Sequence, residues 1–136
     1  MRGLTGTALL RRPVRLRGIT LGRPVDVLLH PQEPTALGLD VLCGDERHRF
    51  LPVSAAEVCP DHVEAASPLV LLDLLDDSFY RLETRPLSAL RGTRVGDGGG
   101  LQDVVLGPDW RIVELVLEGG GRVALSGHVL PGLRSR

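Results

Sequence analysis

Histidine and carboxylate side chains could bind a metal in this chain, but their spacing indicates no metal site. The four histidines are widely scattered and form no pair on one helix face (His30, His48, His62 and His128). His48 follows Asp45 and Glu46 in a predicted turn. Weak metal binding there is one hypothesis, and an exposed charged turn is the interpretation that we adopt.

Two aspartates, Asp26 and Asp103, occupy matching places in two similar sequence blocks, and Asp40 and Glu114 form a second such pair. Paired carboxylates can act as general acid and base, but we expect these on the exposed, polar faces of strands. No serine lies in a Gly-x-Ser-x-Gly turn. The run Gly96–Gly100 lacks the Gly-Lys-Ser/Thr ending of a phosphate-binding loop and precedes a strand. We therefore predict no enzyme activity, no cofactor and no metal.

Cys43 and Cys59 are the only cysteines. Their spacing is not that of a Cys-x-x-Cys motif, and two thiols alone cannot complete a zinc site. We interpret both as small core residues of a reduced protein. A disulfide between them is the alternative.

The basic residues are unevenly distributed, although the net charge is only −1. All sixteen are arginine, and several precede the first acidic residue, Asp26. Four of them are the candidate contacts for a protein or nucleic-acid partner (Arg11, Arg12, Arg15 and Arg17). Alternatively, they face solvent, or pair with the acidic segment 61–83 of the same fold or of a second copy. Aromatic residues make up only 3%, which disfavours stacking on single-stranded nucleic acid.

Hydropathy indicates a soluble protein. No stretch reaches the roughly 18–20 apolar residues of a membrane-spanning helix. The amino-terminal segment has no small-residue cleavage site of the kind that follows a signal peptide. We therefore expect a cytoplasmic location and no transmembrane segment.

Seventeen glycines and ten prolines divide the chain into short segments, which favours strands joined by turns. The apolar pattern predicts five strands in the first half (14–19, 24–29, 36–43, 47–53 and 62–65). Ser54 and Glu57 have capping-box spacing and predict one helical turn. Farther along, 69–72 could be a strand and 74–82 a helix, or one helix could span both.

The clearest pattern is an internal duplication. Four blocks recur in the same order (16–18 and 90–92, 26–31 and 103–108, 39–42 and 114–117, 49–51 and 122–125). A spacing of about 75 residues indicates a single duplication rather than a solenoid array. We divide the chain into a basic amino-terminal arm (1–13), a first repeat (14–67), an ordered connector (68–85) and a second repeat (86–136). Because a unit of about 60 residues is marginally stable alone, we expect the repeats to pack together or to form a homodimer.

The order of strands and turns resembles the PRC-barrel family, which includes domains of the photosynthetic reaction-centre H subunit and of a ribosome-maturation factor. The matching segments cover most of both repeats (Asp26–Pro31, Ala36–Cys43, Phe50–Glu57, Asp103–Pro108 and Ile112–Leu125, with Gly92 and Gly100). One departure is the first copy's short segment Ile19–Leu21, where the second has Thr93–Gly99.

The resemblance implies a mainly β fold of two tandem small barrels packed together, with one or two short helices. It also implies a non-catalytic adaptor that binds a protein partner. Two alternatives remain. One is an RNA- or ribosome-associated assembly factor that uses the arginine-rich amino terminus. The other is a carrier of a small apolar ligand in a cavity between the repeats.

Overall fold

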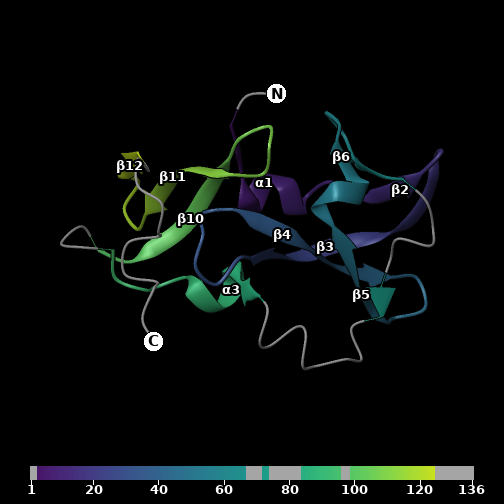
Figure 1. Cartoon of the computed structure of the whole chain (residues 1–136), viewed down its shortest axis with the longest axis horizontal. Coiled ribbons are helices and arrows are strands. Elements are labelled where there is room, and N and C mark those ends of the chain that lie inside the picture. Colours follow the sequence, from purple (N-terminus) through teal and green to yellow (C-terminus); the bar gives the residue numbers. More distant parts are fainter. Residues whose placement is uncertain (1–2, 67–71, 74–83, 96–98, 125–136) are drawn as a thin grey trace.

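The protein is built mainly from β-strands, as a computed structural model shows for residues 3–66, 72–73, 84–95 and 99–124 (Figure 1). The first half contains β1 (Leu4–Thr5), α1 (Gly6–Leu10), β2 (Val14–Leu16), β3 (Ile19–Leu29), β4 (Ala36–Cys43), β5 (His48–Pro52), a 3-10 turn η1 (Val53–Ala55), β6 (Ala56–Val58) and β7 (Val63–Ala65). The remainder contains β8 (Leu72–Asp73), β9 (Arg85–Pro86), α3 (Leu87–Leu90), β10 (Leu101–Leu106), β11 (Ile112–Leu117) and β12 (Arg122–Ala124). The prediction of a mainly β fold with short helices is confirmed.

The strands form two sheets. The larger one curls into a half-barrel with the order β6-β7-β2-β3-β4-β5-β8, and β9 also pairs with β3. The smaller sheet has the order β1-β10-β11-β12. In Figure 1 the smaller sheet occupies the left of the molecule, and the β2–β3 hairpin and β6 lie at the right.

The hairpin between β2 and β3 differs from the prediction. Arg17 and Gly18 both have positive φ angles, of 53° and 87°. Two such residues form the tight turn that suits the twist of a two-residue hairpin. The chain therefore reverses after Leu16, and β3 runs without interruption from Ile19 to Leu29. The separate strands predicted over 14–19 and 24–29 are wrong in their boundaries.

Strand β4 has the predicted bounds, Ala36–Cys43, and most of its residues are buried. Leu39, Val41 and Cys43 are buried, whereas Leu37 is only partly buried. The register between β3 and β4 shifts at this point, since Leu29 pairs with Ala36 and Leu28 with Gly38. Leu37 is thus the extra residue of a bulge, which turns its side chain away from the regular alternation.

The predicted capping box at Ser54 is wrong. The chain forms a 3-10 turn, Val53–Ala55, whose N-cap residue is Pro52 and makes no side-chain cap bond. Glu57 lies in β6, whose residues pair with β7. Strand pairing with β7 therefore overrides the local capping signal.

The central strand pairs of the two sheets share one register. Five Cα pairs of β3 and β4 (Pro24–Val41, Asp26–Asp40, Val27–Leu39, Leu28–Gly38 and Leu29–Ala36) match five of β10 and β11 (Leu101–Leu117, Asp103–Val116, Val104–Leu115, Val105–Glu114 and Leu106–Ile112). Both register shifts recur at matching places. Asp26 and Asp103 are equivalent, as expected, but Asp40 corresponds to Val116 and not to Glu114.

The first strand and helix of each half lie on the other half. β1 pairs with β10 (Leu4 opposite Leu106), and β9 pairs with β3 in the same register (Arg85 opposite Leu29). Residues 4–10 are therefore part of the fold rather than a basic arm, and β9 crosses the boundary that we expected at residue 86. The repeated Leu-Arg-Gly blocks are not equivalent, because one forms the β2–β3 hairpin and the other follows α3.

The two halves meet at an isolated antiparallel bridge between Thr35 and Arg111. On its two sides the backbone bonds are reciprocal: Ala36 N donates to Trp110 O at 2.9 Å, and Ile112 N donates to Pro34 O at 2.8 Å. Because each bond repeats the other with the halves interchanged, the bridge marks a local pseudo-twofold axis.

One hydrophobic cluster joins the two sheets. Its buried members come from both halves and from both helices, and they include Leu9, Leu39, Leu87 and Leu115. Of the connector expected over 68–85, the described parts belong to the first sheet: β8 pairs with β5, and Arg85 at the start of β9 lies opposite Leu29. The strand and helix predicted over 69–82 fall largely outside the described residues.

Candidate functional site

The two equivalent aspartates are buried, which corrects the expectation that they face solvent. Asp26 is 7% exposed and Asp103 is 6% exposed. Asp26 Oδ1 accepts hydrogen bonds from Val27 N at 2.9 Å and from Ser88 N at 3.1 Å, and its Oδ2 accepts one from Ser88 Oγ. Asp103 Oδ2 likewise accepts a hydrogen bond from Thr7 N at 3.1 Å. The second residue of each of these helices, Thr7 in α1 and Ser88 in α3, is thus hydrogen-bonded to an aspartate.

This geometry gives the aspartates a structural role. Each carboxylate lies on the central strand of one sheet and binds the backbone N–H groups at the start of the helix from the other half. A carboxylate beside these N–H groups satisfies donors that have no partner within the helix. Asp26 and Asp103 therefore fasten the exchanged segments reciprocally.

The four candidate arginines do not form one basic surface. Arg12 is turned into the fold, where its Nε donates to Cys59 O at 2.9 Å and its Nη1 donates to Ala8 O at 3.1 Å. Arg17 donates its backbone N–H to Glu64 Oε2 at 2.8 Å. The charge of Arg15 helps to lower the pKa of Asp61, and Arg11 is exposed.

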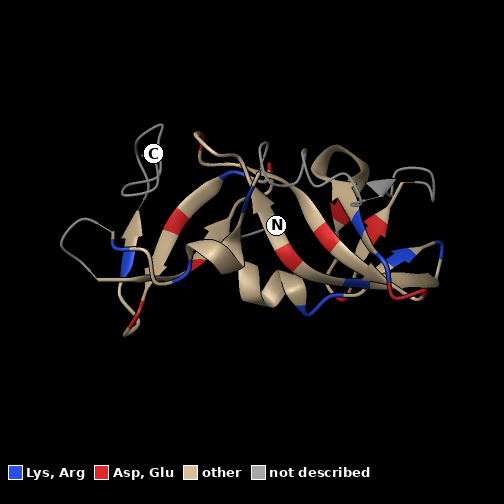
Figure 2. Ribbon diagram, turned by 90° about the horizontal axis from the view of Figure 1, so that it is seen from below, with Lys and Arg blue, Asp and Glu red and all other residues tan. Residues whose placement is uncertain are grey.

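Acidic residues accompany the arginines at this end of the molecule. Figure 2 shows basic and acidic residues interspersed around the β2–β3 hairpin, while the two helices carry no charge. The charges of Arg15 and Arg17 thus lie near Asp61 and Glu64 of the same fold. Within the described ranges, no helix is long and apolar enough to cross a bilayer.

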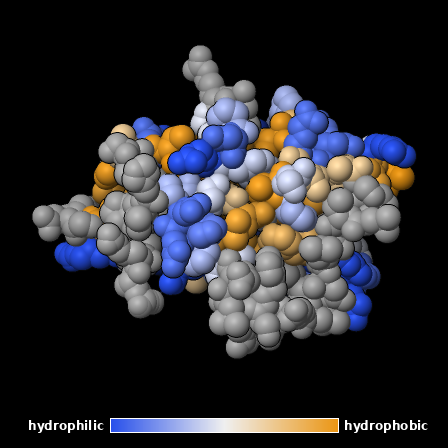
Figure 3. All heavy atoms as spheres, in the orientation of Figure 1, coloured by the Kyte–Doolittle hydropathy of each residue, from blue (hydrophilic) through white to orange (hydrophobic). Residues whose placement is uncertain are grey.

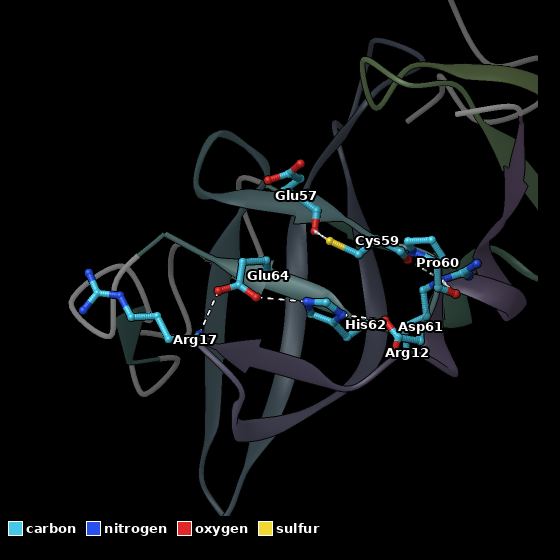
Figure 4. Close-up of polar contacts among 8 residues, drawn as sticks. All are labelled: Arg12, Arg17, Glu57, Cys59, Pro60, Asp61, His62 and Glu64. Carbon is cyan, nitrogen blue, oxygen red and sulfur yellow. Dashed lines mark hydrogen bonds and ion pairs between the residues drawn. The ribbon is translucent and has the colours of Figure 1, made fainter.

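His62 is the centre of a polar cluster between β6 and β7 (Figure 4). Its Nδ1 lies 2.7 Å from Asp61 Oδ1, and its Nε2 lies 2.9 Å from Glu64 Oε1. A neutral imidazole has one N–H group, so both contacts are hydrogen bonds only when the ring is protonated. The bond to Asp61, followed by the bond to Glu64, raises the pKa of His62.

The pKa values of the two carboxylates in this cluster are lowered, whereas that of His62 is raised. The backbone N–H of Arg17, followed by the bond to His62, lowers the pKa of Glu64. The bond to His62 lowers the pKa of Asp61. Glu64 therefore links β7 to the β2–β3 hairpin more strongly when it is ionised.

This cluster predicts a stability optimum in weak acid. The raised pKa of His62 contributes stability that is complete below its ordinary value of 6.5 and is lost as the pH rises through the folded-state value. The lowered pKa of Glu64 contributes stability above its ordinary value of 4.5 that is lost as the pH falls. Urea unfolding of the wild type should therefore show a higher midpoint at about pH 5.5 than at about pH 8.5.

His62→Gln is the control for this prediction, because glutamine can donate a hydrogen bond but does not titrate. The difference between the two midpoints should be smaller in the variant than in the wild type. An NMR titration should place the pKa of His62 above the ordinary value. A lower value, or an equal midpoint difference in both proteins, would contradict the prediction.

The cysteines are free thiols in the structure, with Cys43 buried and Cys59 partly buried. Burial raises the pKa of Cys59, and the charges of Glu57, Glu64 and Asp61 raise it further. Because the thiolate is the reactive form, Cys59 is a poor nucleophile at neutral pH.

The hairpin histidine has a different partner from the one expected. His48 Nδ1 lies 2.8 Å from Asp40 Oδ1. Asp45 instead binds Arg49 through two hydrogen bonds of 3.0 and 2.8 Å, and this contact lowers the pKa of Asp45 to about 2. His30 Nδ1 accepts the backbone N–H groups of the following turn. Among the described residues no group of three metal-binding side chains is present, and His128 lies outside them.

The described pockets do not form an apolar cavity between the halves. At their junction, Glu33, Pro34, Thr35 and Arg111 line a small polar pocket of about 220 Å³. A larger groove of about 420 Å³ lies within the first half, between the ends of β3 and β4, and its lining includes Leu21, Gly22 and Leu42. An apolar ligand would thus have an open groove rather than an enclosed core cavity.

The edge strand β12 and its neighbour β11 expose apolar side chains. Val113 of β11 and Val123 of β12 are 43% and 36% exposed, and all three residues of β12 are exposed. Among the described strands, β12 pairs with β11 alone. Hydrophobic residues reach the surface at this end of the molecule, at the left of Figure 3. Sequence reasoning missed this surface because Val123 has the strand pattern of a core residue.

The comparisons with known proteins indicate no partner for the surface at β12. Comparison of the chain with models of protein families and with curated proteins finds no match. The resemblance to the PRC-barrel family therefore stays a prediction from the sequence pattern.

Proposed function

We propose that this chain is a non-catalytic protein-interaction module, composed of two PRC-barrel-like units, that binds a protein partner at the outer edge of its second sheet. The observation that carries the proposal is the exposed strand β12, with Val123 on it and Val113 on its neighbour. The shared register of the two central strand pairs supports the two related units. Its place of action would be the cytoplasm.

An edge strand has physical properties that suit docking. Its outward N–H and C=O groups have no partner in the sheet, so another chain can complete them. Apolar side chains beside such an edge add hydrophobic contact area, and larger exposed patches of this kind mark interaction sites. Among the strands that the structure describes, β12 has this edge position and carries the exposed Val123.

RNA binding is less well supported by the charges. Phosphate contacts need exposed cationic side chains. Arg12 donates to the carbonyl groups of its own fold, and Arg15 and Arg17 have Asp61 and Glu64 nearby. The acidic neighbours offset the basic charge that a phosphate backbone would require.

Affinity capture with the full-length chain tests the proposal. Val123→Asp introduces a charge on the exposed edge and should abolish retention of proteins that the wild type captures, because the apolar contact is lost. Ile19→Asp is the matched control, since Ile19 is also apolar and is 67% exposed, but lies on the β2–β3 hairpin. Circular dichroism would verify that both variants keep the fold.

The pattern of loss decides the outcome. Proteins retained by the wild type and by Ile19→Asp, but not by Val123→Asp, would support docking at β12. Loss with Ile19→Asp alone would move the docking surface to the hairpin and overturn the proposal. Equal retention by all three proteins would also overturn it.

A further inference from the structure

The edge of β12 has a counterpart within the same molecule. Strand β5 pairs with β4 as β12 pairs with β11, since Leu51 lies opposite Leu39 and Val123 lies opposite Leu115. Leu39 and Leu115 are themselves equivalent. The other edge of β5 is covered by β8, which runs antiparallel to it. The first sheet therefore shows which kind of segment this edge accepts.

The covering strand and the edge it covers match in residue type. Leu72 of β8 stands opposite Phe50, and Asp73 stands opposite Arg49. The paired backbone positions thus combine an apolar residue with an apolar one, and an acidic residue with a basic one. In the shared register Leu51 corresponds to Val123 and Phe50 to Arg122, so β12 has a basic residue where β5 has an apolar one. By the same matching of residue types, an acidic residue suits the position opposite Arg122, and an apolar residue suits the position opposite Val123.

We propose that β12 accepts an extended segment of the partner protein as an antiparallel strand, with an apolar residue opposite Val123 followed by an acidic residue opposite Arg122. The proposal rests on the docking function above and specifies the chemistry of the partner at that surface.

Burial supports an apolar residue at the first position. Val104, Leu115 and Val123 form a cross-strand row in the second sheet, in which the first two are fully buried and Val123 is 36% exposed. The equivalent row in the first sheet is fully buried (Val27, Leu39 and Leu51). An apolar partner side chain beside Val123 would extend the row and cover it.

Charge supports an acidic residue at the second position. Arg122 Nη1 donates to Glu114 Oε1 at 3.1 Å, and the Arg122 side chain is still 55% exposed. A guanidinium has five N–H donors, so it can bind a second carboxylate. The segment after β12, residues 125–136, contains arginine but neither Asp nor Glu, so the chain's own carboxyl-terminal sequence lacks the acidic residue.

Peptide binding to the full-length, isotope-labelled chain tests the inference by NMR. The probe is the capped hexapeptide Thr-Thr-Leu-Asp-Thr-Thr, and its control carries Lys in place of Asp. The Asp peptide should shift the amide signals of β12 and bind about five-fold more tightly than the Lys peptide, because opposite charges attract across paired strands and like charges repel.

Arg122→Glu should reverse this preference, so that the Lys peptide binds more tightly. Arg122→Gln should remove it without placing two acidic residues together, which provides a second variant if the charge reversal disturbs the fold. Arg111→Glu is the matched control, because Arg111 is an exposed arginine of the same half at the bridge before β11. It should leave the preference for the Asp peptide unchanged.

Several results would overturn the inference. The first is that neither peptide binds, and the second is that the signal changes lie away from β12. The third is a preference for the Asp peptide that persists in Arg122→Glu and Arg122→Gln. The fourth is that amides along the outer edge of β12 are protected from hydrogen exchange even without peptide. If Val123→Asp abolishes partner capture but the charge preference is absent, docking at β12 stands and the acidic position fails. If neither Val123→Asp nor the arginine variants have an effect, both proposals fail.

Discussion

Replacing Leu115 by alanine should lower the free energy of unfolding by about 2–5 kcal/mol, and Leu39→Ala should do the same. The two leucines hold equivalent places on β11 and β4, both are 0% exposed, and each lies opposite a fully buried valine. Removing three buried carbon atoms loses transfer free energy and leaves a cavity. Urea unfolding monitored by circular dichroism would measure the effect.

These variants also test whether the two halves share one core. Leu39 and Leu115 belong to the same buried cluster, so each variant should unfold in a single transition. The single tryptophan, Trp110, is a second probe, because its carbonyl oxygen accepts the bond from Ala36 at the junction. Its fluorescence and the circular dichroism signal should change together. Separate transitions, or a loss confined to one of them, would show two independent halves.

Val113→Ala is the control for the core variants. Val113 is an apolar residue of the same strand as Leu115 but is 43% exposed. Surface substitutions of this kind usually change the free energy of unfolding by less than about 0.5 kcal/mol. A loss as large as that of Leu115→Ala would contradict the burial on which the prediction depends.

Asp26→Ala and Asp103→Ala form the second large prediction. Each should lower the free energy of unfolding by about 1–3 kcal/mol, because buried N–H donors lose their acceptor. The cost should be greater at Asp26, which accepts three hydrogen bonds, than at Asp103, which accepts two. Urea unfolding gives the free energies. Faster hydrogen exchange at Ser88 N or Thr7 N would show that the helix from the opposite half has loosened.

Asp109→Ala is the matched control for the aspartates. Asp109 is exposed, and its Oδ1 accepts a hydrogen bond from the backbone N–H of Arg111 at 3.1 Å. Because water can replace this acceptor, the change should be small. Equal losses at Asp109 and Asp26 would mean that the reciprocal fastening of the helices contributes nothing beyond a local turn bond.

Local patterns predicted the elements whose neighbours in sequence are also their neighbours in the sheet. β4 has the expected bounds because its alternation reflects a buried face, and the turn before β5 follows from Gly44 and Asp45. The equivalence of Asp26 and Asp103 was predicted from the repeat. Their burial was not, since it depends on Ser88 and Thr7, which lie 62 and 96 residues away along the chain.

The proposed docking surface at β12 was not predicted from the sequence. The repeated blocks aligned Arg122 with Arg49, but the strand register makes Arg122 equivalent to Phe50 and Val123 to Leu51. Sequence alone also does not say which edge of a sheet is covered. The candidate arginines were selected for their charge, yet Arg12 proved to bind carbonyl groups of its own fold. Charge density along a chain does not reveal where a flexible side chain finds acceptors.

The sequence by itself determined that this protein is a mainly β, duplicated chain, because strand periodicity and repeated blocks are properties of neighbouring residues. Only the tertiary structure decided that the halves exchange their first strand and helix. Strands of two residues, such as β1 and β9, carry no periodicity, and their partners are set by packing across the whole molecule. The resemblance of Thr7-Ala8-Leu9 to Ser88-Ala89-Leu90 was the available signal for this exchange. This signal could be interpreted only in the structure, where Thr7 is hydrogen-bonded to Asp103 and Ser88 to Asp26.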